Sequence, residues 1–311
     1  FGFRVISRSL FIFSFKAMKQ FLYRTFLFTL IPVLYFGINS QINFGVYSNQ
    51  EIPVDDTEVL IAGDSHPMTA INPYLFESAQ NISMSAEPYA ITYWKLRQIF
   101  QISLPEVLIL GFAPHNFSDF NDVKFSAPRF SHEMFTRIYS MDKTVDKLED
   151  IEPFAPVDFV EYYKTFWKQT SFYPHNDHIN YIGQFLIKNS SNLSDWQEII
   201  QRHYYMEDSI CNISELSEFY LDSIAGLCFQ KNVDLILAGN PVHHNYYSAI
   251  PDRFIDAFNR IKAEFDDRVL IVDKTSTVYP DSLFSNSDHL NVLGSRRFTG
   301  DIIDSIKKEK V

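Results

Sequence analysis

The stretch from Glu58 to Met68 most constrains the fold of this chain, because a short apolar segment runs directly into Gly63-Asp64-Ser65-His66. A continuous run of branched apolar residues is typical of a strand buried on both faces in a parallel sheet covered by helices. Ser65 is then expected just beyond the carboxyl end of this strand, at the edge where open α/β sheets place their ligands. Gly63 permits a tight turn, and Pro67 suits the first turn of a helix. A capped turn without chemistry is the alternative, since Gly, Asp and Ser are common in turns.

Four further segments have the composition of short buried strands, and helical patterns separate most of them. The strands are expected at Ala79–Met84, Pro105–Phe112, Val233–Pro241 and Arg268–Asp273. Helices are indicated at Pro88–Phe100, Ser214–Lys231, Pro251–Phe265 and from about Gly294 onward. Such alternation, with right-handed crossovers, predicts an α/β fold: a flavodoxin-like three-layer sandwich whose five-stranded parallel sheet has the order 2-1-3-4-5.

Residues 117–212 interrupt this alternation, and we expect them to form a helical insertion between strands 3 and 4. The segment is rich in aromatic residues and has no obvious strand, while Val157–Lys168 and Ser194–Tyr205 have helical patterns. Long loops without secondary structure are rare in compact domains, so a helical cap is expected. Its aromatic side chains would suit sugar rings or acyl chains near the site, or would form the core of the insertion itself.

The amino-terminal region contains an apolar segment that predicts a membrane anchor. Phe21 to Ile38 carries only one charge, at Arg24, and Met18-Lys19 before it resembles a translation start. Positive residues before an apolar run remain in the cytoplasm, so the rest of the chain is expected to be exported. The run is near the short limit of the ~17–25 residues that cross a bilayer, which leaves a buried helix as the alternative.

These features divide the chain into four parts. We expect possible upstream sequence over 1–17, an anchor helix over 18–40, a polar linker over 41–57 and a single domain over 58–311. The length and the 46% hydrophobic content suffice for one large domain with an insertion.

Charge and composition exclude several classes of function. The formal charge of −11 argues against binding to nucleic acid, which needs basic patches. Cys211 and Cys228 match no metal-ligand spacing and are expected as buried thiols, with a single disulfide left open. The histidine pairs His175/His178 and His243/His244 lack the spacing of a zinc motif, and no phosphate loop or dinucleotide fingerprint is present. We therefore expect neither a metal nor a cofactor.

The last block of the sequence supplies a second chemical motif. Ser285 to Gly294 contains Asp288-His289-Leu-Asn and precedes the final helix. Together with Gly63-Asp64-Ser65-His66, this block resembles the SGNH/GDSL hydrolase superfamily, over roughly residues 58 to 309. The resemblance implies that Ser65 is the nucleophile and His289 its base. In the absence of Ser65, a helix cap would be the alternative role for His289.

A narrower resemblance concerns two shorter segments. Asn81 to Tyr89 and Gly111 to Asn116 look like segments of the membrane-anchored SGNH-like proteins of bacterial cell-surface polysaccharide systems. This likeness implies a bacterial inner-membrane protein with one membrane span, whose domain lies on the periplasmic or extracellular side. It also implies an exported glycan or acyl ester as the substrate.

The third member of the expected triad departs from the family pattern. A serine needs a base, and the base needs a group that holds it in the right tautomer. The family usually has an aspartate three residues before the histidine, where this sequence has Asn286, while Asp288 is adjacent to His289. Because residues three apart in a turn share a face, we expect Asn286 to reach the imidazole better than Asp288. An asparagine orients a histidine but does not stabilise the imidazolium as a carboxylate does.

An oxyanion hole is expected from three donors. Family members use the N–H of the serine, a glycine N–H from the second block and an asparagine side chain from the third. Here Ser65 supplies the first, a backbone N–H near Met84 or Ser85 replaces the absent glycine, and Asn116 is the best match for the third, with Asn240 as second choice.

The expected function is serine-dependent ester hydrolysis or O-acyl transfer on an exported glycan, through an acyl-serine intermediate. The alternative is a non-catalytic SGNH-like binding or scaffold component of a cell-surface polysaccharide system.

Overall fold

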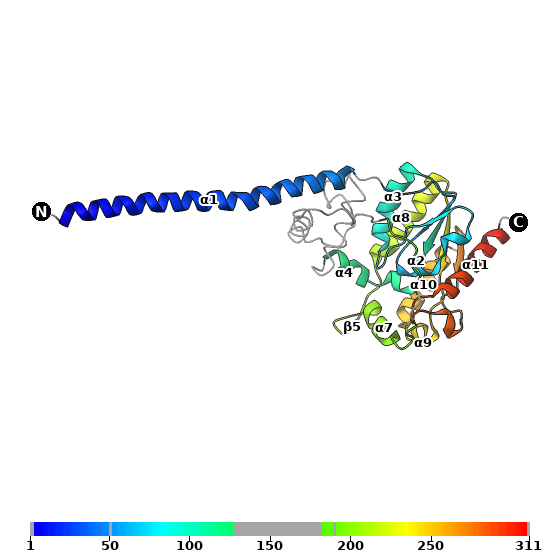
Figure 1. Cartoon of the computed structure of the whole chain (residues 1–311). Coiled ribbons are helices and arrows are strands. Elements are labelled where there is room, and N and C mark those ends of the chain that lie inside the picture. Colours follow the sequence, from blue (N-terminus) through cyan, green and yellow to red (C-terminus); the bar gives the residue numbers. More distant parts are fainter. Residues whose placement is uncertain (1–2, 50–51, 127–181, 189–190, 266, 310–311) are drawn as a thin grey trace. The chain divides into compact units, whose positions relative to one another are not determined.

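The computed structural model describes residues 3–49, 52–126, 182–188, 191–265 and 267–309 (Figure 1). The chain divides into two units, of which the first contains the amino-terminal helix and the second contains the sheet and the helices that cover it. The segment Val157–Lys168 and the pair His175/His178, which were singled out in the sequence, lie outside the described residues.

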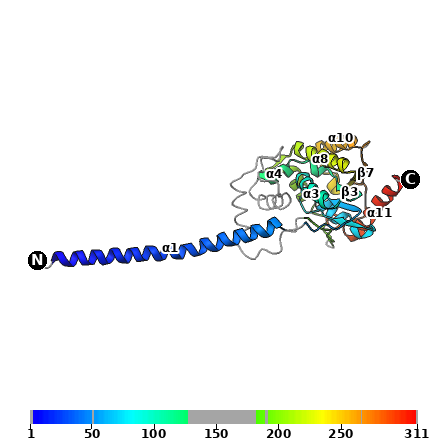
Figure 2. The same ribbon diagram turned by 90° about the horizontal axis from the view of Figure 1, so that it is seen from above.

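The amino-terminal helix α1 spans Phe3–Asn49, and Figure 2 shows it as one long helix. Within it, Phe15–Asn43 is long and apolar enough to cross a membrane, and the apolar window has no buried residue. The helix therefore extends through the first half of the segment expected as a linker, residues 41–57. Once a helix is nucleated, adding a residue to its end costs little, so a polar composition alone does not stop it.

The α/β unit is built on five parallel strands. They are β1 (Val59–Ala62), β2 (Ala79–Asn81), β3 (Val107–Gly111), β6 (Asp234–Gly239) and β7 (Leu270–Asp273). Their order is β2-β1-β3-β6-β7, and every neighbouring pair is parallel. The predicted flavodoxin-like order 2-1-3-4-5 is confirmed.

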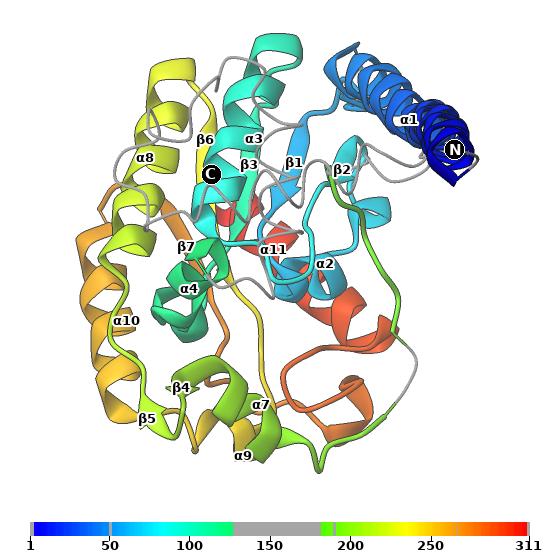
Figure 3. The ribbon, with the colours of Figure 1, turned by 90° about the vertical axis from the view of Figure 1, so that its left-hand side faces the viewer.

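Side chains of the strands alternate between two apolar cores, one on each face of the sheet. Leu60, Leu108 and Leu235 point into the first core, whereas Ile61 and Ile109 point into the second. Helices α3 (Tyr89–Ile102), α8 (Glu215–Lys231) and α10 (Asp252–Phe265) close the first core, and α2 (Ser65–Ala70) and α11 (Val292–Glu309) close the second. In Figure 3, α3 and α8 lie side by side on one face of the strands and α11 lies on the other. The three central strands β1, β3 and β6 are thus buried on both faces, as their unbroken apolar runs predicted, whereas the edge strands β2 and β7 are partly buried.

The reversal of strand order between β1 and β3 positions the loops that matter for function. The chain leaves β1 toward β2 on one side and reaches β3 on the other, which creates a switch point at the carboxyl ends of β1 and β3. The segment after β1 leads to Ser65, and the short helix η2 (Pro114–Phe117) follows β3. The loops converge at this edge, as the sequence indicated.

The described part of the insertion contains helices and one small hairpin. Helix α4 spans Phe120–Ser126 and α7 spans Trp196–Tyr204, the latter in agreement with the helix expected over Ser194–Tyr205. An unpredicted two-stranded hairpin follows, β4 (Tyr205–Met206) with β5 (Ser209–Ile210). Its turn residues Glu207 and Asp208 have φ of 48° and 64°, the positive values that tight hairpin turns need. The usual sequence signal for such a turn is Asn-Gly, which is absent here, so the hairpin was not predicted.

The loop after β2 is held by a buried ion pair. Lys95 of α3 is 2.7 Å from the carboxylate of Glu87, and its ammonium also donates to the carbonyl oxygens of Ile82 and Ile182. Burial of both charges requires such complete pairing. The loop that contains Ser85 is thereby tied to α3.

Elsewhere in the core, Cys211 and Cys228 are both buried and free, so they form no disulfide.

Candidate active site

Ser65 is presented by a strained turn at the end of β1. Gly63 has φ of +130°, a conformation that only glycine adopts readily. Asp64 then caps helix α2, because its side chain accepts a hydrogen bond from the N–H of His66 at 2.8 Å, and Ser65 is the first helical residue. A Cβ atom added at Gly63 would lie 2.8 Å from Pro67, and one added at Gly111 would lie 2.7 Å from the same ring. The two glycines therefore let α2 start directly against β3.

His289 lies within hydrogen-bond distance of Ser65. The His289 Nε2 to Ser65 Oγ distance is 2.8 Å, although the two residues are 224 positions apart in the sequence. The other ring nitrogen, Nδ1, faces two acceptors, the side-chain oxygens of Asp288 and Asn286. Nδ1 must carry the proton to donate to them, so Nε2 is left as an acceptor for the Ser65 hydroxyl. This is the tautomer that a general base requires.

Both candidate orienting groups contact the imidazole of His289, but Asp288 lies closer to it than Asn286, which is the reverse of the expectation. The Asp288 carboxylate is 2.7 Å from Nδ1, whereas the Asn286 amide oxygen is 3.0 Å away. The Asn286 oxygen also accepts the backbone N–H of His289 at 2.9 Å, so its main contact stabilises the loop. This hydrogen bond from the His289 N–H to the Asn286 side chain closes a tight turn. Within that turn the side chains of Asp288 and His289 contact each other, although the side chains of adjacent residues usually diverge.

Burial and pairing set the charge states of the two residues. Burial acts to raise the pKa of Asp288, but the adjacent His289 ring and its hydrogen bond, with His66 nearby, hold that pKa well below the ordinary value. Burial lowers the pKa of His289 below its ordinary value, against the opposing effect of Asp288. At neutral pH the pair is therefore a carboxylate and a neutral imidazole.

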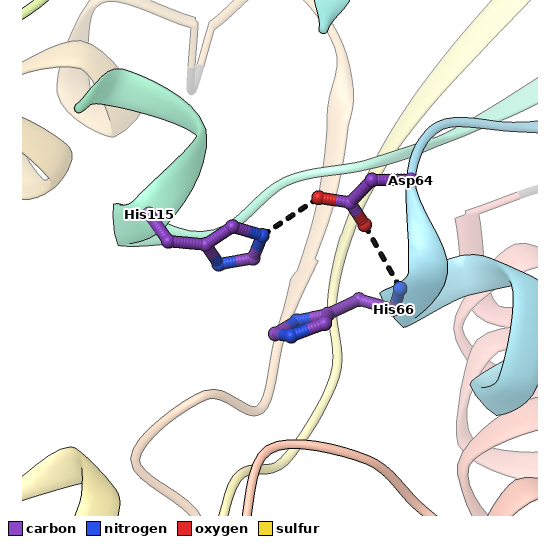
Figure 4. A group of neighbouring side chains, drawn as sticks. All are labelled: Asp64, His66 and His115. Atoms are coloured by element: carbon purple, nitrogen blue, oxygen red, sulfur yellow. Dashed lines mark hydrogen bonds and ion pairs between the residues drawn. The ribbon is translucent and has the colours of Figure 1, made fainter. Parts of the chain in front are cut away.

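Asp64 organises the groups on the other side of Ser65 (Figure 4). One carboxylate oxygen accepts the N–H of His66, while the other accepts from His115 Nε2 at 2.6 Å and from Asn116 Nδ2 at 2.8 Å. The Asn116 oxygen in turn accepts the N–H of Ala113 at 2.8 Å. Although burial raises the pKa of Asp64, its contacts with His115 and His66 lower that pKa far below the ordinary value. Asp64 is thus a buried anion that joins the Ser65 turn to the loop after β3.

The groups expected in the oxyanion hole differ in whether their hydrogen-bond donors are already used within the protein. The Ser65 N–H belongs to the first turn of α2, where backbone donors have no intrahelical acceptor. Ser85 lines the cavity beside Ser65, but the N–H of Met84 donates to the Gly63 carbonyl at 2.9 Å. One hydrogen of the Asn116 amide is donated to Asp64, and the same nitrogen lies 3.5 Å from His115 Nε2, which itself donates to Asp64. Among the described residues, the second amide hydrogen therefore has no acceptor. The second-choice residue Asn240 is buried and donates to its own neighbour, away from the site.

A cavity of about 1050 Å³ opens in front of Ser65 and His289. Its wall includes His203 and Arg202 of α7, Lys188 and Lys124, none of which the sequence pattern indicated. The remaining described lining residues are Asp64, Ser85, Ala86, His115, Phe120, Val123, Gln201, Tyr205, Met206, Glu207 and Asn286. The insertion therefore supplies one wall of the cavity, and no local signal in the sequence predicts which of its side chains face the serine.

Three groups of histidine and carboxylate side chains among the described residues lie close enough to share a metal ion, and one of them is His66, Asp288 and His289 of the site itself. In the group Asp64, His66 and His115, the 2.6 Å between His115 Nε2 and the Asp64 oxygen is a hydrogen-bond distance. Two ligands about 2.0–2.1 Å from one tetrahedral zinc would be ~3.3 Å apart. His243 Nδ1 accepts the N–H of Asn245, and its Nε2 faces Asp281 at 3.3 Å, so this ring is a structural cap. In these two groups, the polar contacts are hydrogen bonds.

Comparisons with known proteins concern the fold alone. No protein-family model and no curated protein sequence matches this chain. Similar solved structures include a protein described as an acylhydrolase from Bacteroides fragilis (12% identity over 85% of this chain and 93% of that chain, TM-score 0.41). A GDSL-like lipase from Bacteroides thetaiotaomicron is 11% identical over 87% of this chain and 98% of that chain, with TM-score 0.39. A catalytic mutant of an acetylxylan esterase from Geobacillus stearothermophilus is 13% identical over 82% and 96%, with TM-score 0.38.

The strand order and the meeting of the first and last sequence blocks at one sheet edge are what the SGNH/GDSL resemblance implied. Activity has to be argued from the side chains.

Proposed function

We propose that this protein is a serine-dependent ester hydrolase or O-acyltransferase that works through an acyl-serine intermediate. The observation that carries the proposal is the continuous chain of contacts Ser65 Oγ to His289 Nε2 (2.8 Å) and His289 Nδ1 to Asp288 (2.7 Å). A nucleophile, a base and an orienting carboxylate at these distances are the arrangement that activates a serine hydroxyl.

In this mechanism, Ser65 Oγ attacks the ester carbonyl while its proton passes to His289 Nε2. The Asp288 carboxylate stabilises the imidazolium that forms. Developing charge on the carbonyl oxygen is stabilised by the Ser65 N–H, by a backbone donor near Ser85 and by the Asn116 amide, and each such donor is worth ~100–1,000-fold in rate. His289 then returns its proton to the leaving alcohol. Water or a second hydroxyl resolves the acyl-serine by the same steps in reverse.

We further propose an exported glycan as the acyl carrier or acceptor. The resemblance of the segments Asn81–Tyr89 and Gly111–Asn116 suggests it, and the cavity supports it in two ways. Its volume of about 1050 Å³ exceeds the needs of a small acyl chain. Tyr205 in its wall offers a flat apolar face of the kind that sugar rings pack against, among polar and basic side chains.

Trapping of the intermediate tests the proposed chemistry. The full chain in detergent is incubated with p-nitrophenyl acetate, quenched in acid and digested, and the peptide that contains Ser65 is analysed by mass spectrometry. We expect an acetyl group on Ser65, which accumulates when water is the only acceptor. Glycan binding without any acyl-Ser65 would instead favour the scaffold alternative.

The membrane orientation is the second part of the proposal. We propose that α1 crosses the bacterial inner membrane once and that the α/β domain lies outside the cytoplasm, because Lys19 and Arg24 lie at the amino-terminal end of the apolar stretch. Protease added to cells with a permeabilised outer barrier is expected to digest the domain while a cytoplasmic control protein stays intact. A protected domain, or its release by a carbonate wash, would contradict this orientation.

A further inference from the structure

His66 follows the proposed nucleophile in the sequence, yet it has no part in the steps described above. Its side chain is 97% buried, and within the described part of the chain neither ring nitrogen has a hydrogen-bond partner. Figure 4 shows the backbone of His66 bonded to Asp64, whereas its ring makes no hydrogen bond to Asp64 or His115. Buried polar groups without a partner are rare, because they lose their hydration and gain nothing in return.

A second buried atom without a partner lies next to this ring. Asp288 is fully buried, and while its Oδ1 accepts from His289, its Oδ2 accepts no hydrogen bond from any described residue. His66 Nε2 lies 3.5 Å from this oxygen. Arg202 also approaches this oxygen, but its guanidinium is half exposed and 3.9 Å away. A shift of about half an ångström would bring His66 Nε2 to hydrogen-bond distance.

We propose that His66 is a positioning residue, which donates an Nε2–H hydrogen bond to Asp288 Oδ2 and so fixes the carboxylate that orients His289. The inference rests on the proposed function, because it assigns a role within the same constellation. One short contact satisfies a buried donor and a buried acceptor together. Asp288 is then held from both sides, with Oδ1 on the general base and Oδ2 on His66. Such contacts are often long in the free enzyme and tighten when the substrate is bound.

The packing around His66 places its ring among three other imidazoles. The ring centroid lies 4.1 Å from that of His115, 5.1 Å from that of His289 and 6.5 Å from that of His203. Among the described residues, the charged groups that act on this cluster are Asp288, Asp64, Arg202 and Lys188. Three other imidazoles confine the ring, so it has little freedom to turn away from Asp288.

Two nearly isosteric substitutions separate the hydrogen bond from the packing. His66→Gln keeps an N–H donor at the position of Nε2, whereas His66→Met fills the same space without a donor. We expect His66→Met to lower kcat for p-nitrophenyl acetate by about 10–100-fold, the effect of losing a hydrogen bond to a charged group, with little change in KM. His66→Gln should stay within a few-fold of the parent. Equal losses in the two variants, or a parental rate for His66→Met, would overturn the proposal.

The pH profile supplies a readout that a purely structural role would not change. For the parent, the acidic limb of kcat/KM reports the pKa of His289, which lies below the ordinary histidine value of about 6.5 because of burial. Without the donor on Oδ2, more of the negative charge of Asp288 is available to stabilise the protonated His289 ring, which raises the pKa of His289. The limb should therefore move to higher pH in His66→Met and stay in place in His66→Gln. An unchanged limb in His66→Met contradicts the proposed contact.

A spectroscopic measurement tests the contact even if no model ester is turned over. The full chain is labelled with ¹⁵N-histidine in detergent, and the tautomer of each ring is read from its nitrogen shifts. We expect His66 to carry its proton on Nε2, and we expect this resonance to shift in Asp288→Asn. A proton on Nδ1 of His66 would overturn the inference. An inactive parent with the expected tautomer would instead count against the proposed function alone.

Discussion

Replacement of Ser65 by alanine is expected to abolish ester turnover, with a fall in kcat of up to ~10⁶-fold, the scale seen when a catalytic serine is removed. The hydroxyl is the only nucleophile within hydrogen-bond distance of His289 Nε2 among the described residues. The measurement is initial rates with p-nitrophenyl acetate, together with labelling by a fluorophosphonate probe. The side chain is partly exposed and carries little packing, so the fold should survive.

The control for this variant is Ser248→Ala, which alters an exposed serine outside the cavity. It should retain the rate and the labelling of the parent. Circular dichroism and the thermal midpoint of Ser65→Ala should match those of the parent. A Ser65→Ala protein that is folded and still hydrolyses the ester at the parental rate would refute Ser65 as the nucleophile.

Substitution of Asp288 by asparagine is expected to lower kcat by about 10⁴-fold, the effect of the corresponding change in a serine protease. An amide at this position can donate to His289 Nδ1 and so favour the tautomer with the proton on Nε2, which cannot accept from Ser65. It also removes the negative charge that stabilises the imidazolium. The volume of the side chain is unchanged, so a change in packing does not explain the loss.

Asn286→Ala provides the comparison, because it removes the second acceptor at Nδ1 and leaves the carboxylate in place. Its contact is longer, 3.0 Å against 2.7 Å, and is shared with the backbone N–H of His289. We expect a loss of roughly tenfold or less, the value of one shared neutral hydrogen bond. If Asn286→Ala proves as damaging as Asp288→Asn in folded proteins, Asn286 is the orienting group after all.

Several elements of this protein follow from short-range patterns in the sequence. The apolar runs within the strands that begin at Val59, Val107 and Asp234 are long enough for one buried strand each, and the turn formers after them mark the strand ends. Gly63 and Pro67 signal the turn that presents Ser65, since each has a backbone preference that no other residue shares. These signals are local, so the sequence predicts the strand order and the edge at which Ser65 and His289 are presented.

Two other features depart from the expectation because spacing and composition do not specify the local backbone geometry. The expected rank of Asn286 over Asp288 came from the spacing of residues in a helical turn, but the loop has a tighter geometry that the Asn286 side chain itself stabilises. Helix α1 also runs beyond the expected anchor, because polar composition does not end a helix.

The sequence by itself determined the sheet and the apolar helix, because backbone preference and apolar periodicity act over a few neighbours. The pairing of Ser65 with His289 was implied by the resemblance of two short motifs to the SGNH/GDSL hydrolases. Only the tertiary structure decided what surrounds them. His66, His115 and His203 come from three elements and pack ring against ring, and Asp64 joins two loops through one carboxylate. Their partners are set by how the elements dock, at distances where a shift of one ångström separates a hydrogen bond from none. No periodicity or spacing in the chain encodes that choice directly.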